Sequence, residues 1–151
     1  MNGRRLIKHL MVLVDGTDAS FRAADLAIDL ACALRARLTA VALGETETLH
    51  QLLSAKILTP SEMTEFEEGL QESAGRQLAE VRERAASRGV ESDVFYAKGN
   101  SETVLPGEIR ARNVDLIVIG LFDSDRAPHD LLDRQRQQAA IHAPCPVLVA
   151  R

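Results

Sequence analysis

Asp15 is the first residue whose type and position suggest a chemical role. It directly follows the uninterrupted apolar run Leu10–Val14 and precedes Gly16. A carboxylate at this point is able to accept hydrogen bonds from an amine or a hydroxyl group of a ligand. The same residue would serve equally well as a turn residue at the entrance of the next helix. Position alone leaves both interpretations open.

A second candidate is the segment Gly99-Asn100-Ser101, which opens a helix after a predicted strand. The free N–H groups and the dipole of a helix N-terminus attract anions. Every helix that follows a strand has such an end, however, so the sequence favours a plain helix cap over a ligand contact.

Histidine and cysteine residues form no catalytic or metal-binding pattern. Cys145 stands between two prolines without a basic partner nearby in the sequence, which indicates a buried apolar residue. The chain has no H-E-x-x-H, G-x-S-x-G or G-x-x-x-x-G-K-[ST] motif. The histidines are scattered without ligand spacing at His9, His50, His129 and His142. We therefore expect no catalytic residue and no metal site.

Composition limits the classes of function. The 151 residues are 46% apolar and 26% charged, which predicts a single globular domain over residues 1–151. The net charge of −4 and the 3% of aromatic residues argue against nucleic-acid binding. No apolar run approaches the ~20 residues of a transmembrane helix. We therefore expect no membrane partner. The two cysteines form no disulfide framework, which predicts a cytoplasmic protein.

The elements that position these residues alternate along the chain. Continuous apolar or β-branched segments predict strands, and each of the first four is followed by a segment with helical periodicity. This pattern is typical of an open α/β fold with a parallel sheet and helices on both faces. Ligands of such sheets bind at the carboxyl ends of the strands. The predicted strands are 10–14, 38–43, 90–97, 115–119 and 147–150, and the predicted helices are 18–34, 60–88, 101–112 and 131–142, with a short helix within 49–57.

Pro106-Gly107 interrupts the helical pattern of Val104, Leu105 and Ile109. Proline inside a helix costs about 3 kcal/mol and glycine about 1 kcal/mol. Either the helix kinks here, or it ends near Leu105 and a new one begins at Pro106, and we favour the second alternative.

Three segments together resemble the universal stress protein family. They are Leu10–Ser20, Asp115–Gly120 and the closing His142-Ala-Pro-Cys-Pro-Val-Leu-Val-Ala-Arg151. The resemblance covers nearly the whole chain, and it implies a five-stranded sheet in the order 3-2-1-4-5. It also implies an adenine-nucleotide-binding, Rossmann-like fold that is usually dimeric.

The family's phosphate-binding motif, Gly-x2-Gly-x9-Gly-Ser/Thr, is largely replaced in this chain. Gly120 matches the first glycine, whereas Asp123, Asp133 and Arg134 occupy the other three positions. A carboxylate and bulky side chains then stand where backbone N–H groups would approach phosphates. Asp15 and Leu43 match the family's contacts to adenosine. The resemblance therefore implies that the adenosine side is retained without the phosphate cradle.

The leading hypothesis is a dimeric regulatory or stress-response module that has lost tight ATP binding and acts on an unidentified protein partner. It is not an enzyme and needs no cofactor, with at most weak binding of ATP or AMP. The alternative is an ATP- or AMP-binding stress protein with a diverged phosphate loop, which leaves slow ATP hydrolysis open. A third hypothesis, an enzyme of a related nucleotide-binding superfamily, lacks a general base or a metal cluster. The predicted homodimer interface is the last strand, Val147, Leu148, Val149 and Ala150.

Overall fold

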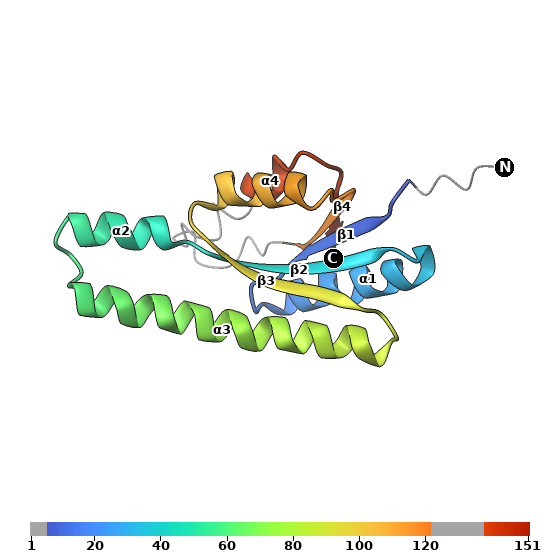
Figure 1. Cartoon of the computed structure of the whole chain (residues 1–151), viewed down its shortest axis with the longest axis horizontal. Coiled ribbons are helices and arrows are strands. Elements are labelled where there is room, and N and C mark those ends of the chain that lie inside the picture. Colours follow the sequence, from blue (N-terminus) through green and yellow to red (C-terminus); the bar gives the residue numbers. More distant parts are fainter. Residues whose placement is uncertain (1–5, 122–137) are drawn as a thin grey trace.

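The computed structural model describes residues 6–121 and 138–151, and within them the chain forms one parallel sheet flanked by helices (Figure 1). All neighbouring strands are parallel, and their order is β3-β2-β1-β4-β5. The fold and the strand order predicted from the sequence are thus confirmed. The elements are β1 (His9–Leu13), α1 (Asp18–Leu34), β2 (Arg37–Gly44), α2 (Thr46–Ser54), α3 (Pro60–Ser87), β3 (Ser92–Lys98), α4 (Ser101–Ala111), β4 (Leu116–Gly120) and β5 (Val147–Ala150).

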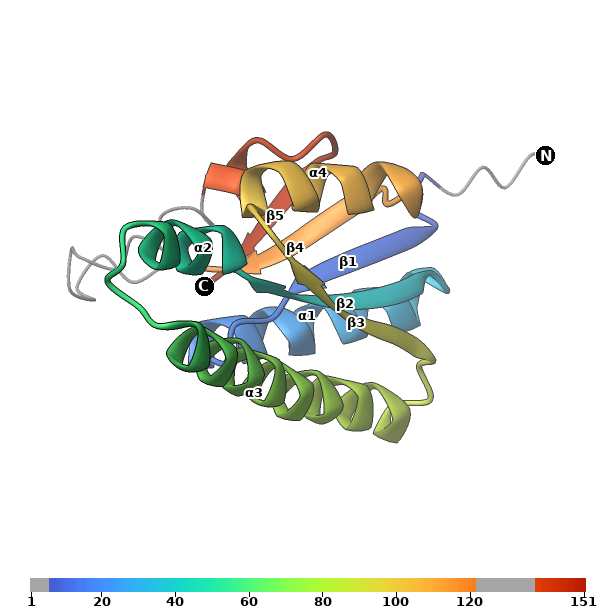
Figure 2. The ribbon, with the colours of Figure 1, turned by 60° about the vertical axis from the view of Figure 1, so that its left-hand side comes forward.

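The central strand β1 separates two hydrophobic layers. Its residues alternate between the faces of the sheet, so Leu10 and Val12 pack toward α1 and α3, whereas Met11 and Leu13 pack toward α4. All four side chains are buried, which explains why the strand is continuously apolar in the sequence. Residues 138–141, which are helical, cover the same face as α4. Figure 2 shows α1 and α3 on one side of the sheet and α4 on the other.

Side chains that cap the helices fix where three of them begin. Thr17 caps α1 by accepting the Ser20 N–H, and Asn100 caps α4 by accepting the Glu102 N–H. Thr59 and Glu62 form the reciprocal capping box that the sequence predicts for α3, with Pro60 in the first turn. These signals are local, because each cap lies within three residues of the N–H group that it satisfies.

The expected restart at Pro106 is wrong, because α4 runs through it without a break from Ser101 to Ala111. Leu105 and Ile109 on either side of the proline are buried against the sheet. The burial of these side chains keeps the turns before and after Pro106 in one continuous helix, although the helix lacks the backbone hydrogen bond that a proline cannot donate. A Cβ added at Gly107 would have no neighbouring atom within 4 Å, so packing does not require glycine here.

Two of the remaining predicted helices differ from the structure or fall outside it. The short helix expected within residues 49–57 lies a few residues earlier, at α2. The predicted helix 131–142 falls largely outside the described residues. No described helix is long and apolar enough to cross a membrane.

Candidate functional site

Asp15 lies in the loop after β1, at the carboxyl end of the sheet. One carboxylate oxygen, Oδ1, accepts hydrogen bonds from the Thr17 N–H at 3.0 Å and from the Thr17 hydroxyl at 2.6 Å. Thr17 then caps α1, so Asp15 shapes the entrance of the helix. Its second oxygen, Oδ2, accepts no hydrogen bond from the described residues. The turn interpretation of Asp15 is therefore confirmed through one oxygen, and a contact of the other oxygen with a ligand stays a prediction.

Gln77 of α3 reaches this loop, and sequence reasoning missed it. Its side-chain amide packs on the α carbon of Gly16, where the Cδ atom would lie 2.8 Å from an added Cβ. Gly16 also has a φ of +81°, which favours glycine. The pairing joins positions far apart in the sequence, so no local signal was able to reveal it.

Leu43 lies near the end of β2, where β2 continues past β1. Its side chain is buried in the layer toward α4. The backbone of Val41 faces β1, because its carbonyl accepts the Val14 N–H at 2.8 Å. Along a strand, the backbone N–H and carbonyl groups of every second residue point to the same side. Those of Leu43 therefore point to the same side as those of Val41, toward the space beyond the end of β1. This is the side on which Asp15 lies.

Gly120 ends β4 and packs directly on the first turn of α1. An added Cβ would lie 2.5 Å from the carbonyl carbon and oxygen of Ala19. This contact requires glycine for packing, independently of any ligand. The other positions of the diverged motif, Asp123, Asp133 and Arg134, lie outside the described residues.

The N-terminus of α4 is already occupied by protein acceptors. Asn100 Oδ1 accepts the Glu102 N–H at 2.9 Å, as the sequence predicts for a plain cap. In addition, Glu45 Oε2 lies 3.4 Å from the Ser101 N–H, and the Glu45 side chain is buried. No local signal in the sequence indicates this carboxylate, since it comes from the residue that follows β2. An anion such as phosphate would have to displace it.

The histidines and cysteines that the structure describes form no reactive site. His9 is buried, with Nδ1 2.8 Å from the Arg112 carbonyl and Nε2 2.6 Å from the Thr39 hydroxyl, so it is a structural core residue. Cys145 packs at the edge of the layer toward α4, and this partial burial raises the pKa of its thiol. Cys32 is exposed. Among the residues described, no group of three or more His, Cys, Asp and Glu side chains is placed to hold a metal ion.

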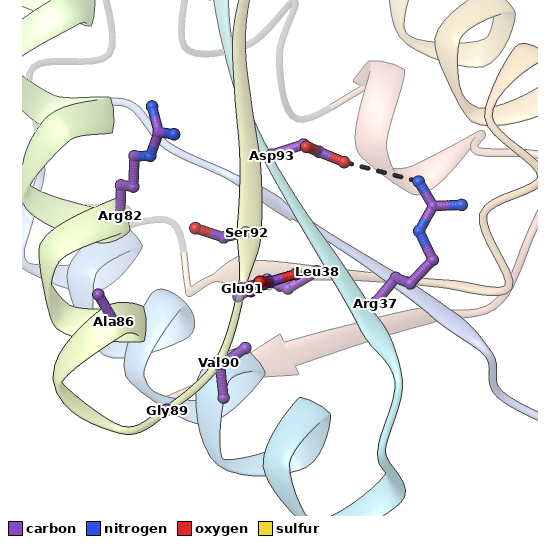
Figure 3. Close-up of a pocket in the computed structure, with 9 residues that line it drawn as sticks. All are labelled: Arg37, Leu38, Arg82, Ala86, Gly89, Val90, Glu91, Ser92 and Asp93. Carbon is purple, nitrogen blue, oxygen red and sulfur yellow. Dashed lines mark ion pairs between the residues drawn. The ribbon is translucent and has the colours of Figure 1, made fainter.

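A groove of about 570 Å³ lies at the opposite, amino end of the sheet, between α3 and β3 (Figure 3). Its charged lining is balanced, with Arg37 and Arg82 against Glu91 and Asp93, and Arg37 pairs with Asp93 at 3.5 Å. Balanced, exposed charges favour no particular ligand. The carboxyl end therefore remains the better candidate site.

The last strand, β5, forms one edge of the sheet. Val149 is 46% exposed, Val147 and Leu148 are half-buried, and Ala150 is buried. The carbonyls of Pro146 and Ala150 accept hydrogen bonds from Ile117 and Leu121, so the alternate groups of Val147 and Val149 point away from β4.

Comparison with known proteins gives a consistent result. The family model described as "Universal stress protein family" matches residues 6–151. The chain is 25% identical to the "Universal stress protein YxiE" of Bacillus subtilis, over 97% of this chain and 100% of the relative. A crystal structure of a universal stress protein family member from Burkholderia pseudomallei superimposes with a TM-score of 0.74 at 23% identity, covering 99% and 98% of the two chains. A universal stress protein solved in complex with cAMP gives a TM-score of 0.67 at 21% identity, covering 96% and 97%.

Proposed function

Because the chain belongs to the universal stress protein family, we propose that it is a homodimeric regulatory module that has lost tight ATP binding. It keeps the adenosine side of the site, at Asp15 and Leu43, and acts through a protein partner rather than by catalysis. The related protein solved with cAMP supports retention of an adenosine site. The cytoplasm is the expected compartment.

The observation that carries the loss of ATP binding is the charge of the site. The loop after β1, residues 14–17, and the single residue that links β2 to α2 contain the carboxylates Asp15 and Glu45 and no lysine or arginine. In the sequence, the loop that would hold the phosphates has four carboxylates against three arginines, so it carries no excess positive charge: Asp123, Asp125, Asp130 and Asp133 against Arg126, Arg134 and Arg136. Carboxylates repel the negative charges of a triphosphate, whereas the repulsion is weaker for a monophosphate and absent for an uncharged nucleoside.

The test is calorimetry of the purified protein with Mg-ATP, AMP and adenosine. We expect ATP to bind weakly or not at all. A dissociation constant near 1 µM for ATP, about −8 kcal/mol, would contradict the proposal and favour the ATP-binding alternative.

A companion variant restores the motif with Asp123→Gly, Asp133→Gly and Arg134→Ser. If the replaced positions cause the loss, this variant binds ATP more tightly than the wild type. Unchanged affinity would mean that the loop is not the reason.

Dimerisation is proposed through β5. The exposed Val149 and the outward backbone groups of Val147 and Val149 support an antiparallel pairing with a second copy. The alternative is a monomer whose edge is covered by Arg151 and the segment Leu52–Ile57. Against it, α2 packs on α3, and Val149 stays exposed in the described structure.

A further inference from the structure

We propose that Gln77 of α3 reads the base of a purine nucleoside held at Asp15 and selects adenine over hypoxanthine and guanine. The inference rests on the nucleoside side of the function proposed above. It adds to that site a residue from a third element, beyond the ends of β1 and β2.

The first support is the position of Gln77. Its amide lies against Gly16, the residue directly after Asp15, in a contact that only a glycine leaves room for. Figure 2 shows how this arises, since α3 runs alongside α1 and passes the point where α1 begins. Gln77 is half-buried, so its amide is held near the loop while part of the residue stays exposed.

The second support is the hydrogen-bonding capacity left at this point. Within the described part of the chain, the Gln77 amide makes no hydrogen bond, although it offers two N–H donors and a carbonyl acceptor. Asp15 Oδ2, on the residue before Gly16, likewise has no protein donor among the described residues. A capping or loop-fastening role would use these groups, whereas the side-chain hydrogen bonds of this turn in the described part of the chain are made by Asp15 Oδ1, Thr17 and Ser20.

The chemistry of the two groups specifies the ligand. Adenine presents a donor at N6 beside an acceptor at N7, and a glutamine amide pairs with both at once. Hypoxanthine and guanine present two acceptors, O6 and N7, so the amide carbonyl would face another oxygen. Asp15 Oδ2 only accepts hydrogen bonds and therefore suits a ribose hydroxyl.

Two further residues lie on the same face of α3 as Gln77. Leu70, Ser73 and Gln77 follow one another at spacings of three and four residues and share a face of the helix. Leu70 is half-buried and lies two turns before Gln77.

The experiment titrates the full-length protein with adenosine and with inosine, followed by NMR so that millimolar affinities are measurable. We expect the wild type to bind adenosine about tenfold more tightly than inosine, the size that a lost bidentate contact gives. Gln77→Met keeps the length and packing of the side chain and removes its hydrogen bonds, so the ratio should fall to near one. Gln71→Met, an exposed residue of the same helix, is the matched control and should keep the wild-type ratio.

The outcomes separate this inference from the proposed function. If Asp15→Ala weakens adenosine binding while Gln77→Met keeps the ratio, Gln77 is not a specificity residue and the adenosine site stands. If the wild type binds no adenosine at all, both the inference and the nucleoside side of the proposal are wrong. Tight ATP binding would contradict only the proposed loss of the phosphate cradle.

A measurement on the wild type covers the case in which Gln77→Met fails to fold. The side-chain amide resonances of Gln77 should shift on addition of adenosine, with those of Gln71 unchanged. Unmoved Gln77 resonances at saturation would overturn the inference.

Discussion

Gly120, the last residue of β4, is required by the atoms around it, whereas a glycine inside a helix is not, and this difference is measurable. Gly120 meets the backbone of Ala19, which cannot move without shifting the first turn of α1. Gly75, inside α3, has nothing within 4 Å of an added Cβ. The same substitution should therefore have opposite effects at the two sites.

Gly120→Ala should destabilise the protein by about 1–3 kcal/mol or more, because an added methyl group has to push α1 away from β4. Gly75→Ala should raise the free energy of unfolding by up to about 1 kcal/mol, since alanine is the better helix former. Urea unfolding of both variants checks the pair. A neutral Gly120→Ala would mean that this glycine is not set by packing.

Cys145 and Cys32 should differ in reactivity toward iodoacetamide. Partial burial favours the neutral thiol of Cys145 and raises its pKa, an effect that the hydrogen bond from the Ile117 backbone only partly offsets. Exposed Cys32 should label first near pH 8, and labelling of Cys145 should keep increasing at pH values above the usual thiol range.

Mass spectrometry of the labelled peptides across pH provides the measurement, with urea-unfolded protein as the control in which both residues react alike. The sign for stability follows from the same shift. The contribution of Cys145 to the free energy of unfolding is fully present below the ordinary thiol pKa, and it is lost as the pH rises through the raised pKa of the folded protein. Faster labelling of Cys145 than of Cys32 in the folded protein would contradict this.

At the scale of elements, the features predictable from the sequence are those with a local cause. The strand of Leu10–Val14 is continuously apolar because both faces of β1 are covered, and Thr59 with Glu62 signals the start of α3 within four residues. Gln77 against Gly16 and Glu45 at the start of α4 had no such signal, because each contact joins distant segments. The prediction of the site was therefore limited to the loops that follow strands.

Helix α4 shows a local rule overridden by packing. Proline propensity predicted a break at Pro106, whereas burial of Leu105 and Ile109 keeps the helix whole. The helix should gain from removal of the proline. Pro106→Ala restores the N–H that can donate to the Glu102 carbonyl and removes the ring from the preceding turn.

We expect Pro106→Ala to raise the free energy of unfolding by about 1–3 kcal/mol, part of the intrinsic difference between the two residues being offset by the greater freedom of the unfolded chain. Urea unfolding measures it, with Ala111→Gly at the end of the same helix as a control expected to destabilise. A loss of stability in Pro106→Ala would show that the proline serves α4 in some other way.

At the scale of the whole molecule, the sheet has two edges with different surroundings. The outer strand β3 packs closely against α3, which runs along it (Figure 1). The other outer strand, β5, carries the exposed Val149. An apolar, exposed edge with outward N–H and carbonyl groups is a template for pairing, so β5 is the edge at which we expect the second copy.

The test is light scattering at micromolar concentration, where a homodimer should have twice the 16.5 kDa mass of the chain. Val149→Pro should convert the dimer into a folded monomer, because it removes an outward N–H. It leaves intact the bonds of Pro146 and Ala150 that hold β5 to β4. Val149→Ala keeps that N–H and should remain dimeric. A wild-type monomer would reject the dimer outright, and a Val149→Pro variant that folds and stays dimeric would place the interface on another surface.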